Sequence, residues 1–390
     1  MYMYNKTIIA LNISLTVCLS SLYAASESEQ QRIAEQHSAA QMILGASSSS
    51  SESKQRKHPI IWGSSAHQGG RKTMEDFYSA QTPFEDSHKK AFFGMFDGHR
   101  GDMAARALAK GNSRIKPLHV AFAECIEGTA VERFQHAFRV TEESILSHCN
   151  NSGSTAVTAY IDTEKNTVTV AGIGDSRAVL VRNNSILATT DHNPKRPKEL
   201  ERITKAGGLI SPADDAFPRY LSGYSGERLA MTRVFGNKDY KKGEYKLRGL
   251  VANPEIAHIK YEDTDNVFLI LATDGLWDVV SNQDAADIVA STLNSYISSK
   301  TDVIYQPFEA GNNEAVVLAA RKLRNKAYKL GSKDNISVLV AVINQWHDSA
   351  FAFNFTSEKP FETIDTIPIA SKIEEAPSSP NYYEDILLNN

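Results

Sequence analysis

The stretch AFFGMFDGH at residues 91–99 begins as an apolar run and ends in Asp97-Gly98-His99, and VFLILAT at 267–273 leads in the same way into Asp274-Gly275. A short apolar run closed by Asp-Gly predicts a buried strand that ends in a turn. Such a turn holds a carboxylate just beyond the strand end, where a rigid sheet can fix its position. Because Asp-Gly is also ordinary turn chemistry, one instance indicates little. The recurrence of the pattern is what suggests a site.

Other acidic residues stand in comparable positions beside predicted strands. They are Glu75-Asp76 after the segment 70–74, Asp334 before the apolar run 336–343, and Asp175 between the strand-like stretches 168–173 and 177–181. Carboxylates, together with backbone carbonyls and water, are the ligands that Mg²⁺ and Mn²⁺ prefer. The chain has no Cys/His cluster with zinc-like spacing. Separate turn and cap residues would be the alternative, but the repeated place at strand ends favours a metal site.

A series of short motifs follows over most of residues 60 to 345. In chain order they are GRKTMED (70–76), FDGHRG (96–101), GSTA (153–156), AGIGDSRAV (171–179), DH (191–192), ERITKAGG (201–208), LAMTRVFGN (229–237), LILATDGLWDVV (269–280) and GSKDNIS (331–337). In content and order this series resembles the metal-dependent serine/threonine protein phosphatases of type 2C, the PPM family. GRKTMED and ATDGLWD are fairly specific to that family, whereas DGH alone is a weak signal.

The order of predicted elements gives a fold class without the resemblance. Strands, helices, strands, a helix and a strand follow one another, which indicates an α+β fold with largely antiparallel sheet. Apolar residues at helical spacing predict helices over 131–149 and 313–330, with Gly331 as a stop. The resemblance implies something more specific, a β-sandwich of largely antiparallel sheets flanked by helices, with the metal centre at one edge.

The resemblance also implies a centre of two Mn²⁺ or Mg²⁺ ions, with a third ion in some members. Asp97 would bridge the two ions, and Gly98 would offer its backbone carbonyl. Asp274 and Asp334 would complete the coordination shell of one ion. Asp76 and Glu75 would hold the other ion, largely through water. Asp175 and Asp278, with Asp274 shared, match the third site. The need for several hard oxygen donors follows independently from the ions.

Two further residues receive chemical roles from the resemblance. Arg71 is expected to clamp the substrate phosphate, because its planar fork matches two phosphate oxygens and a lysine does not. His99 is expected to be the general acid that protonates the leaving serine or threonine oxygen. Without the surrounding motifs, Arg71 would be interpreted as a solvated charge on a loop and His99 as a structural histidine. The matched residues His192, Glu201 and Arg202 are expected to support structure, and Asp191 to be a turn or cap residue.

The sequence departs from the family pattern at three places. Arg100 replaces the usual second glycine after DGH, which adds a charge that can bias substrate choice. Asn237 stands where the family normally has Asp, which puts a local hydrogen bond or charge pair in doubt but not the metal centre. The segment 213–227 is longer than usual, rich in turn residues, and falls in the family's flap region beside the active site.

Composition agrees with a globular enzyme. The 390 residues hold one large domain or two, and 42% are hydrophobic, as in ordinary proteins with a sizeable core. A net charge of −4 provides no basic field, so nucleic acid is not an expected partner.

Phosphorylated proteins are the expected partners, and we expect a monomer. A catalytically inactive binding module with the same fold is the alternative, but such relatives commonly lose metal carboxylates that this chain keeps. A calcium-stabilised adhesion domain would leave Arg71, His99 and the motif order unexplained.

The two ends of the chain differ from its middle. Residues 1–25 resemble a signal peptide, 26–57 a polar linker, 58–346 the catalytic domain and 347–390 an acidic, disordered tail. An uncleaved anchor or a disordered apolar start is the alternative for the first segment. If the leader is cleaved, we expect a secreted or periplasmic protein. If it is not cleaved, we expect a cytoplasmic or membrane-anchored protein. The alternating Phe351, Phe353 and Phe355 could instead form an edge strand. Cys125 and Cys149 are expected to be unpaired thiols.

Overall fold

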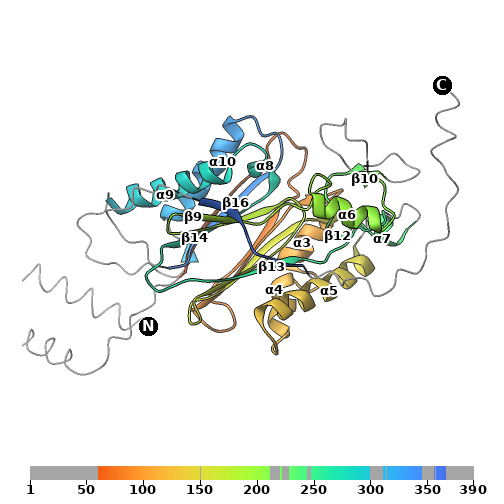
Figure 1. The fold of residues 1–390 in the computed structure, drawn as a ribbon, viewed down its shortest axis with the longest axis horizontal. Coiled ribbons are helices and arrows are strands. Elements are labelled where there is room, and N and C mark those ends of the chain that lie inside the picture. The colour runs from red at the N-terminus through yellow and green to blue at the C-terminus, as the bar shows by residue number, and fades with distance from the viewer. Residues whose placement is uncertain are drawn as a thin grey trace, which may run out of the picture. The chain divides into compact units, whose positions relative to one another are not determined.

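Two sheets are stacked face to face with helices on their outer faces (Figure 1). The computed structural model describes residues 60–149, 151–210, 220–221, 228–243, 247–298, 311–312, 314–344, 355 and 357–365. These all belong to the unit that begins at Lys57. The predicted leader and linker, and most of the flap segment 213–227, lie outside the described residues.

The first sheet has seven strands. Their order across the sheet is β15 (Gly311–Asn312), β1 (Ile61–His67), β16 (Ile336–Val342), β14 (Val267–Ala272), β8 (Arg177–Arg182), β9 (Ser185–Ala188) and β17 (Ser357–Pro360). The second sheet has six, in the order β18 (Ile364–Asp365), β13 (Glu255–Lys260), β7 (Thr167–Ile173), β6 (Ala156–Asp162), β3 (Lys90–Phe96) and β2 (Phe77–Gln81). All pairings are antiparallel except β1 with β15 and β9 with β17. The prediction of a largely antiparallel sandwich is confirmed.

The alternation of side chains between the two faces of a strand explains why the runs 91–96 and 267–272 contain no polar side chain. In β3, Phe93 points into the sandwich interior, whereas Phe92 and Phe96 pack against helices on the other face. In β14, Leu269 joins the interior and Phe268 joins the helices of the opposite layer. Since successive side chains alternate between faces, a strand covered on both faces has no polar positions.

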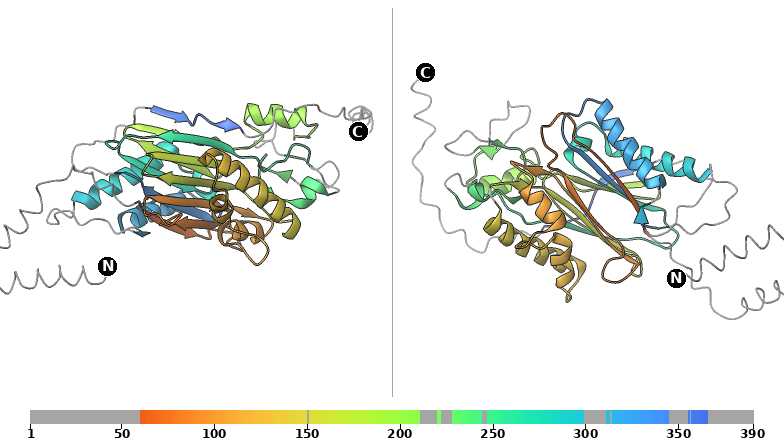
Figure 2. Two further views of the ribbon diagram at one scale, coloured as in Figure 1. Left: turned by 90° about the horizontal axis from the view of Figure 1, so that it is seen from below. Right: turned by 180° about the vertical axis from the view of Figure 1, so that it is seen from behind.

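The helices form two groups, one on each sheet (Figure 2). The six-stranded sheet is covered by α3 (Met103–Lys110), α4 (Leu118–Glu124) and α5 (Ala130–His148). The seven-stranded sheet is covered by α8 (Asp274–Trp277), α9 (Asn282–Ser298) and α10 (Glu314–Lys329). The helices predicted at 131–149 and 313–330 are confirmed as α5 and α10. Thr129 and Glu132 form a capping box at the start of α5, which fixes that boundary.

A smaller group of elements lies beside the sandwich. A three-stranded sheet joins β12 (Phe235–Gly236), β5 (Gly153–Ser154) and β4 (Gly98–His99), and a two-stranded one joins β10 (Tyr220–Leu221) and β11 (Arg228–Leu229). Helices α6 (Pro197–Lys205) and α7 (Lys238–Lys242) stand next to them. This group has its own small apolar cluster, which includes Ile203, Leu229 and Tyr240.

The prediction of a disordered tail over 347–390 is wrong for its described part. Strand β17 pairs with β9, strand β18 pairs with β13, and Phe361 between them is buried in the sandwich interior. Sheet edges offer unpaired backbone groups, and here the segment pairs with two such edges and buries Phe361 between its strands. Phe351 and Phe353 of the suggested edge strand lie outside the described residues, Phe355 belongs to no strand, and the described strand that follows is β17. Cys125 and Cys149 are free thiols, as predicted.

Candidate metal centre

The ends of strands from both sheets surround one cavity. Asp97 follows the last residue of β3, Asp274 begins α8 just beyond β14, and Asp334 precedes β16. Because β14 and β16 are antiparallel neighbours, the end of one and the start of the other meet at the same edge of the sheet. The pattern of acidic residues at strand ends therefore becomes a cluster in space.

The cavity has a volume of about 910 Å³ and an acidic floor. Nine of the ten predicted site residues line it, namely Arg71, Glu75, Asp97, Gly98, His99, Asp175, Asp274, Asp278 and Asp334. The tenth, Asp76, is not in the lining but is buried at 6% exposure. Its carboxylate accepts a hydrogen bond from Thr273, the residue before Asp274, at 3.0 Å.

Crowding among these carboxylates changes their acid–base behaviour. Burial and the neighbouring Asp274 and Asp76 raise the pKa of Asp97 well above its ordinary range. Burial, with Asp278 and Asp334 nearby, raises the pKa of Asp274 to about 7. Burial is also the main reason that the pKa of Asp76 rises to about 7. Ionised carboxylates this close repel one another unless cations lie among them.

Unsatisfied oxygens point to the same need for cations. Three carboxylate oxygens, Oδ1 of Asp76, Oδ1 of Asp175 and Oδ1 of Asp274, are buried and have no hydrogen-bond partner in the described part of the chain. A buried polar atom without a partner is costly, and a hard divalent cation is the partner that several such oxygens share best. The donor set therefore fits Mg²⁺ or Mn²⁺. Among the described residues, no three acidic, His or Cys side chains are already placed around one point as a finished ligand set.

Arg71 occupies part of this space. Its guanidinium forms an ion pair with Asp334, which also lines the cavity, and the Arg71 side chain is 63% exposed. An exposed ion pair contributes little to stability, so it opens at small cost. The long, cationic side chain of Arg71 therefore lies next to a predicted metal ligand. From this position its guanidinium can bind either the Asp334 carboxylate or an incoming anion.

His99, from strand β4, also lines the cavity. Its Nε2 is 2.7 Å from Oδ1 of Asn237, and its Nδ1 is buried without a partner among the described residues. Burial lowers the pKa of His99 to about 4, so the ring is neutral at physiological pH in this structure. Its general-acid role stays a prediction.

Residues that sequence reasoning undervalued also line the cavity. Asp191, expected to be a turn or cap residue, lies in the lining and accepts two hydrogen bonds from Arg177, at 2.9 and 2.7 Å. Asn335 lies there too, accepts from the Glu75 backbone at 2.7 Å and donates to the Thr73 carbonyl at 2.9 Å. The motif GSKDNIS contained this asparagine, and its place directly after Asp334 was the only signal for it.

Arg100 does not extend freely toward a substrate. Its guanidinium pairs with Asp239 at 2.9 Å and stacks on the Tyr240 ring, 4.7 Å from the ring centroid. Its φ of 58° is a left-handed conformation, which disfavours residues with a side chain. Arg100, which replaces the usual glycine, therefore links the 97–101 turn to helix α7. Its predicted effect on substrate choice stays a prediction.

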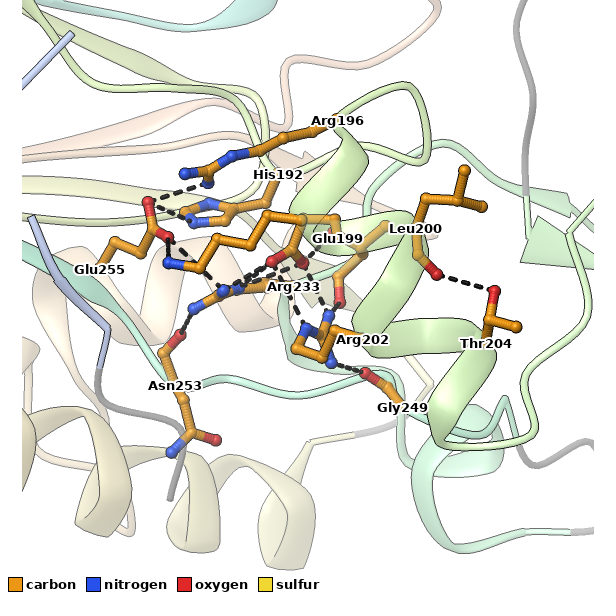
Figure 3. A network of polar contacts seen from close by, with 12 residues as sticks. His192, Arg196, Glu199, Leu200, Arg202, Thr204, Arg233, Gly249, Asn253 and Glu255 are labelled. Carbon is orange, nitrogen blue, oxygen red and sulfur yellow. Dashed lines mark hydrogen bonds and ion pairs between the residues drawn. The ribbon is translucent and has the colours of Figure 1, made fainter. Parts of the chain in front are cut away.

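A buried ionic network joins helix α6 and strand β13 to the segment around Arg233 (Figure 3). At its centre, Glu199 of α6 and Arg233 are both fully buried, and the guanidinium donates to the carboxylate at 2.6 Å. Arg202 donates to the same carboxylate at 2.7 Å, and Arg196 donates to Glu255 of β13 at 2.8 Å. His192 is buried beside Glu255. His192 and Arg202 therefore support structure, as predicted, whereas Glu201 lies on the exposed helix face and pairs with Lys205. Arg233 lies within the motif LAMTRVFGN and Glu199 lies outside every quoted motif, and no role was predicted for either residue.

Comparison with known proteins agrees with this fold and site. The sequence model of the family described as Protein phosphatase 2C matches residues 62–336. "Probable protein phosphatase 2C 7" of Oryza sativa subsp. japonica is 35% identical over 283 residues, which cover 71% of this chain and 64% of that protein. "Probable protein phosphatase 2C 11" of Arabidopsis thaliana is 34% identical over 284 residues, which cover 72% of this chain and 65% of that protein. The chain belongs to the protein phosphatase 2C family.

Solved structures show the same architecture. The serine-threonine phosphatase 2C from Toxoplasma gondii superposes with a TM-score of 0.54 at 24% identity, covering 73% of this chain and 97% of that one. A sex-determining protein of C. elegans gives a TM-score of 0.58 at 22% identity, covering 73% of this chain and 65% of that one. At these identities the likeness concerns the fold alone. The match spans less than two thirds of the length of the first curated relatives, 64% and 54% for two of them.

Proposed function

We propose that this chain hydrolyses phosphoserine and phosphothreonine in proteins and that it needs Mn²⁺ or Mg²⁺ to do so. The observation that carries the proposal is a set of buried carboxylate oxygens that have no hydrogen-bond partner among the described residues. Two belong to Asp175 and Asp274 in the lining of a cavity that also presents Arg71, and the third belongs to Asp76 beside it. An acidic cavity repels a phosphate dianion unless cations intervene. Family membership and the names of the relatives support the same activity.

The carboxylates divide into groups that would hold the ions. Asp97, the Gly98 carbonyl, Asp274 and Asp334 would serve the first, Asp76 and Glu75 would serve the second together with Asp97, and Asp175 and Asp278 with Asp274 would serve a third. When bound, a pair of divalent ions neutralises phosphate charge and makes water a stronger nucleophile. Asp76 contributes from behind the cavity wall, where Thr273 holds its carboxylate in place.

Arg71 is proposed to bind the substrate phosphate. It forms an ion pair with Asp334 in the structure, and that carboxylate is a proposed ligand. Cation binding at Asp334 would therefore release the guanidinium, whose planar fork matches two phosphate oxygens. Metal binding and phosphate binding would then favour each other through a single side chain.

His99 is proposed to protonate the leaving alkoxide. In the structure, the ring is neutral and its Nε2 is engaged by Asn237, so it must first take up a proton at Nδ1. It can then deliver that proton to the departing serine or threonine oxygen, which is a poor leaving group without it. Preference for these alkyl esters over phosphotyrosine rests on family resemblance alone. Phosphorylated proteins would be the partners of a monomeric enzyme.

The decisive experiment is hydrolysis of a small phosphate ester and of a phosphothreonine peptide with Mn²⁺, with Mg²⁺ and with a strong chelator. We expect turnover only with an added ion, because all proposed ligands are hard oxygens. Full turnover in chelator, with metal confirmed absent, contradicts the metal centre. Metal binding without turnover on any phosphate ester would favour the alternative, an inactive binding module.

Export from the producing cell is a separate proposal. It is supported by the apolar run at residues 7–22, followed by small residues at Ala24 and Ala25. We expect a mature form that begins near Ala25 or Ser26 and acts on phosphoproteins outside the producing cell. N-terminal sequencing of protein from the native host decides this, and an intact Met1 on protein from inside the cell removes the proposal. Among the described residues, no helix is long and apolar enough to cross a membrane.

A further inference from the structure

His99 and Asn237 lie 138 positions apart in sequence and are joined through the small three-stranded sheet. In this sheet β5 is the middle strand, and His99 of β4 and Gly236 of β12 both pair with Gly153. A Cβ at Gly153 would lie 2.2 Å from Oδ1 of Asn237 and 2.4 Å from Nε2 of His99. The absence of a side chain at Gly153 is therefore what allows the two residues to meet.

The orientation of the Asn237 amide is fixed by a partner that can only accept. Its Nδ2 donates to the backbone carbonyl of Asn151 at 3.0 Å, which places Oδ1 toward His99. An amide oxygen can only accept a hydrogen bond, so the His99 nitrogen that faces it must carry the proton. The neutral ring is consequently the Nε2–H form, and the lone pair is at Nδ1.

The segment that carries Asn237 is anchored from two sides. Glu142 of α5 accepts from the Gly236 backbone at 2.9 Å and from the buried Lys241 of α7 at 2.5 Å. On the other side, Asp239 of α7 holds Arg100, the residue that follows His99. Asn237 itself has a φ of 50°, a left-handed conformation that asparagine tolerates better than most residues. The amide therefore stands on a rigid turn.

We propose that Asn237 is a positioning residue that commits Nε2 of His99 to the protein and leaves Nδ1 as the ring nitrogen that serves the substrate. The contact fixes both the tautomer and the tilt of the ring, as a hydrogen-bonded partner does for histidines in general. Its catalytic consequence rests on the proposed function, whereas the tautomer does not.

The test compares Asn237→Gly with Asn237→Asp in the full chain. Glycine removes the acceptor and keeps the left-handed backbone accessible, and aspartate restores an acceptor at the same place. Lys242→Met is the matched control, because Lys242 is an exposed residue of the same helix, α7, and its replacement leaves the Glu142 anchor in place. With [¹⁵N]histidine and Mg²⁺, a two-bond ¹H–¹⁵N spectrum identifies the protonated nitrogen, and the His99 signal is assigned by its loss in His99→Gln.

We expect the wild type and Asn237→Asp to show Nε2–H, and Asn237→Gly to show a mixture of tautomers. On a phosphothreonine peptide, kcat in Asn237→Gly should fall roughly tenfold or more with KM little changed, as for a misplaced catalytic group, and Asn237→Asp should recover most of the loss. An Nδ1–H tautomer in the wild type overturns the proposal, and so does a tautomer unchanged in Asn237→Gly. A kcat loss in Lys242→Met as large as that in Asn237→Gly overturns the positioning role. If the wild type hydrolyses no phosphate ester, the proposed function fails and the tautomer alone decides this proposal.

Discussion

Thr273 donates a hydrogen bond from its hydroxyl to the carboxylate of Asp76, at 3.0 Å and across 197 positions of sequence. The same hydroxyl oxygen accepts from the backbone N–H of Ser337 at 3.1 Å. The residue that precedes Asp274 thus also orients Asp76, and it is itself held by β16. One side chain at the end of β14 therefore couples three segments that carry proposed metal ligands.

Replacing Thr273 by valine tests this coupling. Thr273→Val keeps the shape and removes the hydroxyl, so Asp76 loses its orienting partner. Loss of such an outer partner lowers metal affinity by roughly 10- to 100-fold. We expect the Mn²⁺ concentration that raises the melting temperature to increase by about that factor. Thr158→Val is the control, because Thr158 also has a fully buried hydroxyl, bonded to the Ala171 carbonyl. An equal Mn²⁺ response in both variants would show that Thr273 does not act through the centre.

Removing Asp97 and Asp274 together should be little worse than removing one. Both are proposed ligands of the same ion, so either change empties or distorts the site, as for residues that act as a unit. Each single alanine variant should lose on the order of a thousandfold in turnover. The metal-free fold should survive, since alanine relieves the crowding that raises the pKa of both carboxyls. Turnover is measured beside thermal melting, with and without Mn²⁺. Near-normal turnover in Asp274→Ala, with a melting temperature still raised by Mn²⁺, would remove Asp274 from the site.

His99→Ala should affect poor leaving groups most. A serine alkoxide needs a proton as it departs, whereas an aryl oxide needs little help. We expect turnover of a phosphoserine peptide to fall roughly 100-fold or more and that of an aryl phosphate to fall much less. The measurement is the ratio of the two rates in the variant and in the wild type. An equal loss on both substrates would assign His99 a structural role.

The buried network around Glu199 should govern acid stability. Burial alone would raise the pKa of Glu199, but hydrogen bonds from Arg233 and Arg202 outweigh it and hold the pKa well below the ordinary 4.5. Because the folded-state pKa is the lower one, this stabilisation is complete above the unfolded pKa and is lost as pH falls through the folded one. The free energy of unfolding of the wild type should therefore decline below about pH 4.5.

Glu199→Gln isolates that contribution. It removes the nearer of two carboxylate partners of the buried Arg233, whose other partner is Glu255 at 3.7 Å. We therefore expect a loss of about 3 kcal/mol near neutral pH and a weaker decline in acid. Glu201→Gln lies two positions along the same helix, and Glu201 is exposed and paired with Lys205. This control should change the free energy of unfolding by less than about 0.5 kcal/mol. Urea unfolding of the three proteins across the acid range provides the comparison, and parallel curves for the wild type and Glu199→Gln would refute the assignment.

Local sequence patterns were enough to predict the central strands and the places of the acidic residues beside them. A run such as 267–272, apolar at every position, has to be covered on both faces, and Asp-Gly has to follow as a turn, so both β14 and the location of Asp274 could be predicted. Helices α5 and α10 were predictable for the same local reason, the spacing of their apolar residues.

Which side chains meet depends on how the chain folds in three dimensions. The pairs His99 with Asn237, Arg71 with Asp334 and Glu199 with Arg233 join segments far apart in the chain, and no local pattern encodes the approach of two such segments. The strand at 357–360 was missed because its stability comes from the edge of β9 and from the burial of Phe361, not from its own residues. Periodicity and turn chemistry are properties of neighbouring residues, whereas a hydrogen-bond partner or a sheet edge is supplied by the folded chain.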